Sequence, residues 1–357
     1  MEFPIDSVRA PRIDPSRIDP SSIGPSSIGR RDARRRRTLI ALALAGLAAC
    51  LPTMATAQSY PARPVKFIVP FPPGGAIDTL ARMTAQHLST AWGQPVTVEN
   101  RPGAGGIIGT DAVAKAQPDG LTLGWGAVST HGINAALYKK LPYDTLKDFA
   151  PVAPVAIVPN LLVVNASMPV QTVQDLVTLA RQQPGKLSYA SAGSGTTLHI
   201  SCELFKRIGN VDLLHVPYKG SGPALTDVLA GQVPVMCDSV TSALPHLKSG
   251  KLRALGITST RRSSVLPAVP TLAEAGLKDY EMNPWFGMFA PAGTPAAIVA
   301  QVNRDVQKVL ALPEVRTRLQ EIGADPMAAT PEQFADIVRA DVDKWGRLIR
   351  EMGITAD

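Results

Sequence analysis

The sequence has little of what most enzymes and metalloproteins display. Only 3 of its 357 residues are cysteine, and no C-x-x-C pair is present. Its 5 histidines include no H-E-x-x-H motif and no close pair at metal-ligand spacing. No G-x-S-x-G elbow occurs, and no Walker lysine follows a glycine-rich loop. We therefore expect no metal, no cofactor and no catalytic residue, although a Ser/His/Asp triad built from distant positions stays open.

Long apolar runs and a strong excess of one charge are also missing after residue 57. No segment there approaches the ~20 consecutive apolar residues of a membrane span, so we expect the mature chain not to cross a membrane. The formal net charge is +7, but residues 1–57 alone hold 9 arginines against 5 acids, which leaves 27 basic and 24 acidic residues. So small and scattered an excess argues against a nucleic-acid partner.

The first 57 residues are predicted not to belong to the folded protein. A Pro/Ser-rich five-residue unit repeats over residues 13–27, and we expect disorder there, or a start codon placed too far upstream. Arginine-rich sequence, an apolar stretch at 39–51 and an A-x-A pattern ending at Ala57 then predict a signal peptide cleaved after Ala57. The alternative is a lipoprotein, because Leu47-Ala-Ala-Cys50 would allow an anchor at Cys50.

Two cysteines, Cys202 and Cys237, remain after that cleavage. An oxidising compartment permits a disulfide, but two cysteines do not make a framework. Both lie in apolar patterns, which favours buried free thiols. Whether the two residues pair is left open by the sequence.

The mature chain alternates short β-rich runs with helical stretches, and its length suits two domains. Strand-like runs are followed by helical patterns throughout, which predicts α/β domains with largely parallel sheets covered on both faces. The strand runs are 65–70, 96–99, 121–126, 161–164, 187–190, 213–216, 233–237 and 252–258. The helical patterns are 76–92, 173–183, 197–208, 223–230, 295–310, 313–322 and 331–352.

Two loops between a strand and a helix are the candidate binding elements. They are Phe71-Pro-Pro-Gly-Gly75 and Ser191-Ala-Gly-Ser-Gly-Thr-Thr197. Ligands of open α/β sheets bind at such loops, and free N–H groups at a helix start favour anions. Together the loops predict two facing cradles for an anion without an ionic clamp. Asp78, Asp238 and His199 lie nearby, and each has an equally plausible structural role as a helix-dipole partner, a cap or a first-turn histidine.

The glycine-rich segment 103–109 only superficially resembles a dinucleotide fingerprint. Its third glycine of the G-x-G-x-x-G pattern arrives one residue late, and the segment does not open the first βαβ unit. We interpret it as a tight turn with close backbone packing.

Many ordered motifs make the chain resemble a known family from about Tyr60 to Ile354. They are YPxRP (60–64), PGGxxDxxAR (73–82), VENRPGAGG (98–106), PDG (118–120), LPYD (141–144), DFxPV (148–152), SxGxGTxxH (191–199), VPYKGxGPA (216–224) and APAGTP (290–295). The chain is similar to the Bug-type periplasmic solute receptors of tripartite tricarboxylate transporters.

The resemblance implies a type II periplasmic-binding-protein-like fold, with two α/β lobes joined by crossover segments and a ligand cleft between them. Lobe 1 would comprise residues 60–158 and 284–357, and lobe 2 residues 159–283. The ligand-binding residues it implies are Phe71, Gly74, Gly75 and Asp78 on one side, Ser191, Gly193, Thr196 and Thr197 on the other, with Ser129, Thr130, Tyr218 and Asp238 along the wall.

By resemblance the protein is a monomeric periplasmic receptor that binds a small carboxylate and delivers it to a membrane permease. The carboxylate could be a di- or tricarboxylate, an acidic amino acid or an aromatic acid. Two alternatives stay open: a sensor that presents the bound ligand to a signalling partner and, more remotely, a hydrolase acting on a carboxylate ester. We expect Gly75→Pro to weaken binding, because it removes an amide donor and strains the first loop.

Overall fold

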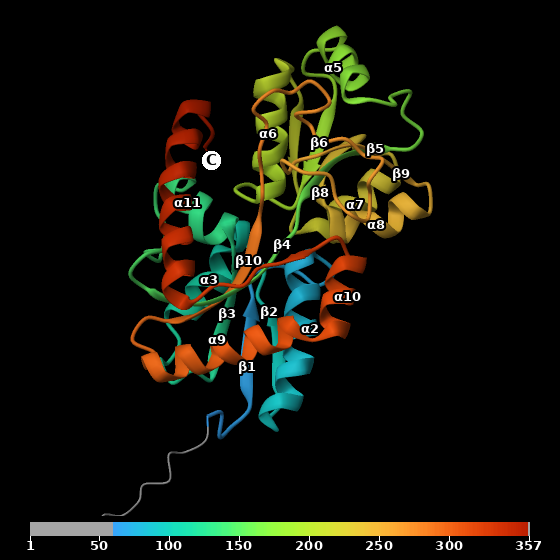
Figure 1. The fold of residues 1–357 in the computed structure, drawn as a ribbon. Coiled ribbons are helices and arrows are strands. Elements are labelled where there is room, and N and C mark those ends of the chain that lie inside the picture. Colours follow the sequence, from blue (N-terminus) through green and yellow to red (C-terminus); the bar gives the residue numbers. More distant parts are fainter. Residues whose placement is uncertain (1–59, 356–357) are drawn as a thin grey trace, which may run out of the picture. The chain divides into compact units, whose positions relative to one another are not determined.

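The computed structural model describes residues 60–355, which form two α/β lobes, each built around its own sheet (Figure 1). The predicted repeat, the signal peptide with its cleavage site after Ala57, and Cys50 lie outside the described residues. Between residues 60 and 355, no helix is long and apolar enough to cross a membrane.

The first lobe contains a six-stranded sheet in the order β11-β4-β10-β3-β1-β2. Its strands are β1 (Val65–Val69), β2 (Val96–Asn100), β3 (Thr122–Ala127), β4 (Phe149–Ile157), β10 (Trp285–Pro291) and β11 (Asp325–Pro326). Helices α2 (Ala76–Trp92), α9 (Ala296–Ala311) and α10 (Pro313–Glu321) pack on one face. Helices α3 (Ile107–Ala114), α4 (Asn134–Leu137) and α11 (Pro331–Met352) pack on the other, beside the short turns η1 (Ala104–Gly106) and η2 (Ser129–Ile133).

The second lobe contains a five-stranded sheet in the order β7-β6-β8-β5-β9. Its strands are β5 (Asn160–Asn165), β6 (Ser188–Ser191), β7 (Leu214–Pro217), β8 (Val235–Ser239) and β9 (Leu252–Ile257). Helices α5 (Val173–Gln182) and α6 (Thr197–Gly209) cover one face, and α7 (Ser221–Leu229) and α8 (Val240–Lys248) cover the other.

Alternation along the central strands explains why each sheet needs helices on both sides. In β1, Val65, Phe67 and Val69 belong to the core under α2 and α9, whereas Ile68 points into the core on the opposite face. Successive side chains of a strand point to opposite faces, so a strand with buried apolar side chains on both faces must be covered twice.

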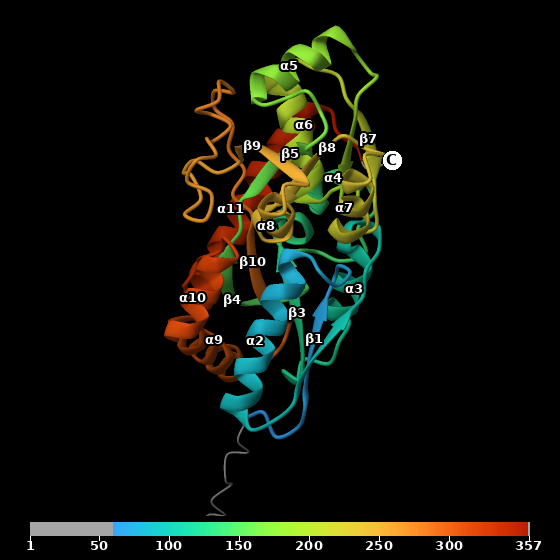
Figure 2. The same cartoon turned by 90° about the vertical axis from the view of Figure 1, so that its right-hand side faces the viewer.

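The strands that carry the chain between the lobes overturn the prediction of largely parallel sheets. β1 pairs in parallel with β2 and β3, and β6 with β7 and β8. Every pairing of β4, β5 and β10 is antiparallel. Only Val158 and Pro159 separate β4 from β5, so the chain passes from the first sheet to the second without an intervening helix (Figure 2).

The glycine-rich segment 103–109 forms the tight turn that its sequence predicts. Gly106 has a φ of 92°, a conformation that favours glycine. A Cβ on Gly109 would lie 2.7 Å from both the Arg101 carbonyl oxygen and the Pro70 Cα. Close backbone packing therefore accounts for these glycines.

Candidate ligand-binding site

A cavity with about 510 Å³ of empty space, open to solvent, lies between the two lobes. From the first lobe it is lined by Phe71, Pro72, Gly75, Ala76, Ile77, Ser129 and Phe286. From the second it is lined by Asn160, Ala192, Thr196, Thr197, Leu198, Ser221, Asp238, Ser239 and Ser242. Asp238 is the single ionisable side chain among these lining residues. The cavity therefore offers small hydroxyls and backbone groups and has no cationic side chain in its lining.

The first loop brings the start of α2 to this cavity. β1 ends at Val69, and the following prolines cannot continue the ladder. Gly74 has a φ of 92°, and Gly75 caps α2 without a side-chain hydrogen bond. The first N–H groups of a helix have no partner within the helix, so those of α2 are available at the cavity wall. The structure thus places an anion-favouring helix start where the sequence predicts it.

Asp78 holds that loop in shape rather than lining the cavity. Its carboxylate accepts hydrogen bonds from Asn100 Nδ2 (2.8 Å), Arg82 Nε (3.0 Å) and Gly74 N–H (3.1 Å). Burial alone would raise its pKa, but the hydrogen bonds from Arg82, Asn100 and Gly74 outweigh burial and keep the pKa below its usual value. Asp78 is therefore ionised and positions Gly74 at the start of α2.

The second loop brings the start of α6 to the same cavity. Thr196 caps the helix by accepting from His199 N–H at 3.2 Å, and its hydroxyl donates to the Gly193 carbonyl at 2.7 Å. Gly193, at φ 122°, makes the turn possible. Thr197 and Leu198 follow in the first turn and line the cavity. Two helix starts, from α2 and α6, therefore face the cavity from opposite lobes.

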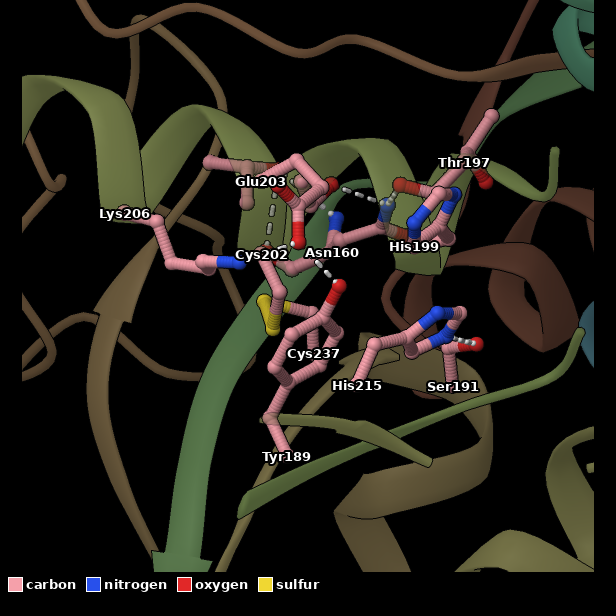
Figure 3. The surroundings of a disulfide bond; sticks show 12 residues. Asn160, Tyr189, Ser191, Thr197, His199, Cys202, Glu203, Lys206, His215 and Cys237 are labelled. Atoms are coloured by element: carbon pink, nitrogen blue, oxygen red, sulfur yellow. Dashed lines mark hydrogen bonds and ion pairs between the residues drawn. A yellow bond between two sulfur atoms is a disulfide. The ribbon is translucent and has the colours of Figure 1, made fainter. Parts of the chain in front are cut away.

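A stack of aromatic rings supports the second loop from below (Figure 3). Ser191 Oγ lies 2.7 Å from His215 Nε2, and the His215 and His199 rings stack with centroids 4.1 Å apart. Gly195 N–H donates to His199 Nδ1 at 3.3 Å. Burial lowers the pKa of His199 to about 4 and that of His215 to about 3. Both rings are therefore neutral at pH 7, and the loop depends on that state.

Ser191 Oγ and His215 Nε2 lie as close as a nucleophile and its general base would, but the Ser191 hydroxyl has a structural role. Its side chain is fully buried, and its hydroxyl oxygen also accepts the Gly193 N–H at 3.1 Å. The pair results from neighbouring strands, since Tyr189 of β6 pairs with His215 of β7. That register could not be deduced from sequence spacing.

A disulfide joins α6 to β8 behind this stack (Figure 3). Cys202 and Cys237 are bonded, with their Cα atoms 5.8 Å apart, and both are fully buried. The sequence-based preference for free thiols was therefore wrong, although burial was correct. Apolar spacing indicates that two cysteines are internal, but only the packing of α6 on the sheet brings them within bonding distance.

Asp238 closes the inner wall of the cavity from the end of β8. It is fully buried; its Oδ1 accepts from the Ser221 hydroxyl at 2.7 Å, and its Oδ2 has no hydrogen-bond partner among the described residues. Burial raises its pKa to about 7, against the hydrogen bonds from Ser221 and the Ser239 N–H. Ser239 then caps α8, accepting from Ser242 N–H at 3.3 Å.

The structure brings together six of the twelve predicted site residues at the cavity wall. They are Phe71, Gly75, Ser129, Thr196, Thr197 and Asp238. Gly74, Asp78, Ser191 and Gly193 shape the two loops, as described above. Thr130 is buried against the backbone of Ala127, and Tyr218 donates to Asp227 at 2.6 Å beside a neighbouring hollow that Gly193 also lines.

Sequence reasoning missed several lining residues. They are Pro72, Ala76, Ile77, Asn160, Ala192, Leu198, Ser221, Ser239, Ser242 and Phe286. Some are neighbours of predicted residues and follow from the loops themselves. Asn160, Ser221 and Phe286 come from the crossover strands and from α7, where a single residue gives no local signal. Among residues 60–355, no group of three or more His, Cys, Asp or Glu side chains is placed to hold a metal ion.

Comparisons with known proteins agree with this geometry. Residues 80–354 match the model of the tripartite tricarboxylate transporter family receptor. The periplasmic binding protein BugD is 36% identical, with a TM-score of 0.80 over 83% of this chain and 99% of that chain. A protein of R. palustris solved with adipate is 40% identical, with a TM-score of 0.81 over 83% and 99% of the two chains. MatC from Rhodopseudomonas palustris, solved with bound malate, is 39% identical, with a TM-score of 0.78 over 81% and 100%.

These matches extend over both lobes and most of the described chain. They agree with the cavity, whose lining offers helix starts and hydroxyls for holding a ligand. The chain belongs to the receptor family of the tripartite tricarboxylate transporters, and it is a Bug-type solute-binding protein rather than an enzyme.

Proposed function

We propose that this protein is a periplasmic receptor that captures a small dicarboxylate between its lobes and delivers it to a membrane permease of the tripartite tricarboxylate type. The observation that carries the proposal is the convergence of helix starts on one cavity without a basic side chain in its lining. Residues at the starts of α2, α6, α7 and α8 all line it. Backbone N–H groups and the positive end of the helix dipole stabilise an anion there.

A dicarboxylate is the class that this cavity suits best. The starts of α2 and α6 face it from opposite lobes, so each can hold one carboxylate of a short acid. Two relatives at 40% and 39% identity were solved with adipate and malate, both of which are dicarboxylates. Tricarboxylates, acidic amino acids and aromatic acids belong in the same test panel.

The predicted signal peptide supports export to the periplasm, with cleavage after Ala57. An anchored form attached at Cys50 would reach the same compartment.

Binding through backbone amides suits a receptor that must release its cargo, because no buried ion pair has to be broken.

A thermal-shift screen of the exported, processed protein tests the proposed function. The protein is refolded after denaturation to remove any co-purified cargo and then mixed with each acid and, as a matched control, with the neutral diamide of the same acid. A ligand at about 100 times its Kd stabilises the fold by about 2.7 kcal/mol. We expect shifts with a few related dicarboxylates and none with their diamides.

Two results would contradict this proposal. Equal shifts with acids and diamides would show that charge is not recognised, and the absence of a shift with every acid would remove the carboxylate assignment. Recovery of the intact acid after incubation is also expected, because the receptor does no chemistry on its ligand.

A further inference from the structure

Asp238 is the one ionisable side chain that lines the ligand cavity, and half of its carboxyl group is uncommitted. Oδ1 accepts the Ser221 hydroxyl at 2.7 Å, whereas Oδ2 is buried without a hydrogen-bond partner among the described residues. A buried polar atom without a partner is unfavourable, and Asp238 lines the binding cavity, so we expect its uncommitted oxygen to meet a ligand atom.

Among the described residues, no cation is placed to neutralise Asp238 and an anionic ligand together. The elements packed against β8 carry Tyr189 on β6, His199, Glu203, Lys206 and Arg207 on α6, Asp227 on α7, and His246 and Lys248 on α8. Arg207 donates to the Glu351 carbonyl at the far end of α6. Tyr189 and Lys206 are both bonded to Glu203, Asp227 is bonded to Tyr218, and His199 is neutral. Across the cavity, the nearest charged pair on α2 is Asp78 with Arg82, neither of which lines the cavity.

The pKa of Asp238 follows from this isolation. Burial raises it to about 7, and the opposing effects are the hydrogen bonds from Ser221 and the Ser239 N–H rather than any positive charge. A ligand carboxylate bound beside Asp238 in the cavity adds a second negative charge. Two carboxyl groups that share a site without a cation bind a proton between them, because like charges disfavour a second ionisation.

We propose that Asp238 is protonated in the ligand-bound receptor and that its Oδ2–H donates a hydrogen bond to a carboxylate oxygen of the ligand, so that binding takes up one proton from the medium. The inference rests on the proposed function, since it requires an anionic ligand in this cavity. In this proposal Asp238 contributes to ligand affinity as a neutral hydrogen-bond donor. The affinity for the ligand therefore falls as pH rises.

Isothermal titration calorimetry of the exported, processed receptor with succinate and with adipate tests this directly. Titrations near pH 8.5, in two buffers of different ionisation enthalpy, give the number of protons bound with the ligand. Both carboxyl groups of each free acid are ionised at that pH, so any proton bound together with the ligand comes from the medium, and the Asp238→Asn variant tests whether Asp238 carries it. We expect an uptake close to one proton and a Kd that rises at least about tenfold between pH 7 and pH 9.

Asp238→Asn supplies the variant, because the amide keeps the shape and a donor but cannot ionise. It should bind succinate within about threefold of wild type at pH 7, at least about tenfold more tightly than wild type at pH 9, and without proton uptake. Asp212→Asn, at an exposed position of the same lobe, is the matched control and should behave as wild type. If Asp238→Asn does not fold, the proton count of the wild-type protein still decides.

Malate distinguishes the opposite assignment, in which an ionised Asp238 accepts from a ligand hydroxyl. In that case wild type would take up no proton, and Asp238→Asn would weaken malate about tenfold or more while sparing succinate; this outcome overturns the inference and leaves the proposed function intact. Failure of wild type to bind any acid of the panel would overturn both.

Discussion

At the scale of single residues, the first loop presents its main chain to the cavity. Gly75 caps α2 at φ −82° and ψ 169°, and a Cβ added there would meet no atom within 4 Å. That φ lies close to the range of proline, so we expect less of the backbone strain that the sequence predicts for Gly75→Pro. What remains of the argument is the loss of the N–H donor.

Gly75→Pro and Gly75→Ala therefore form a matched pair. Alanine keeps the amide and has room for its methyl group, so we expect the Kd for a dicarboxylate to change by less than about threefold. Proline removes the donor and should weaken binding by about 1–3 kcal/mol, which is about five- to 150-fold. Calorimetry gives both values, with circular dichroism as the check on folding. Wild-type affinity in a folded Gly75→Pro protein would remove this loop from the site.

The buried histidines show what residue-level prediction misses. The sequence suggested that His199 either contacts the ligand or plays a structural role, and its ring accepts the Gly195 N–H beneath the loop. Ser191 was predicted to touch the ligand, but its hydroxyl faces His215 inside the second lobe. A motif identifies which residues belong to a loop, whereas the direction of each side chain depends on packing from a neighbouring strand.

At the scale of elements, the disulfide ties together two parts of the site. Cys202 lies on α6, whose first turn lines the cavity, and Cys237 immediately precedes Asp238 on β8. The sequence separation is 35 residues, so the bond closes a substantial loop of the unfolded chain. Cross-linking of this kind stabilises the folded state mainly by restricting the unfolded one.

Removing this bond should destabilise the receptor by about 2–5 kcal/mol. Urea unfolding of wild type with and without a reductant, beside the Cys202→Ala/Cys237→Ala double variant, measures the effect. The double variant should match reduced wild type to within the cost of its truncated side chains and should not respond to the reductant. Equal stability of the oxidised and reduced wild-type protein would contradict this prediction.

Elements with a strong local pattern were predictable, and those defined by long-range pairing were not. The α2 pattern at 76–92 and the C-terminal helices agree with the observed bounds because apolar spacing and prolines at helix starts are local signals. β10 was missed, and so was α8, which carries a proline at position 245. The antiparallel pairing of β4, β5 and β10 depends on how the chain passes between lobes, which no local pattern encodes.

At the scale of the whole described chain, the site exists only when both lobes contribute. The lobe boundaries at 158/159 and 283/284 stay a prediction, but the contributions to the cavity are plain. Residues far apart in sequence, such as Ser129, Asn160 and Phe286, meet there because β5 and β10 begin at the cavity and η2 follows the end of β3. The two loops and Asp238 were predicted from strand–helix spacing and family resemblance added Ser129, whereas the contributions of the crossover strands lie beyond sequence periodicity.

Direct contacts across the cleft hold the two lobes together beside the cavity. The Tyr138 hydroxyl, in the first lobe, donates to the Ser194 carbonyl of the second loop at 3.1 Å. A Cβ on Gly105 would come within 2.6 Å of that same carbonyl oxygen, so the two lobes approach closely here. A hydrogen bond between the lobes stabilises their arrangement around the cavity, so we expect it to contribute to ligand affinity more than to the stability of either lobe.

Tyr138→Phe removes that hydroxyl and keeps the ring, so it should raise the Kd for a dicarboxylate by about two- to twelvefold, the equivalent of about 0.5–1.5 kcal/mol. The melting temperature of the ligand-free protein should stay close to that of wild type. Tyr60→Phe is the matched control, because Tyr60 donates to the Gly120 carbonyl at 2.7 Å within the first lobe. That control should lower the melting temperature and leave the Kd unchanged. If Tyr138→Phe instead lowered stability without weakening binding, the contact would belong to the folding of the receptor and not to its closure around the ligand.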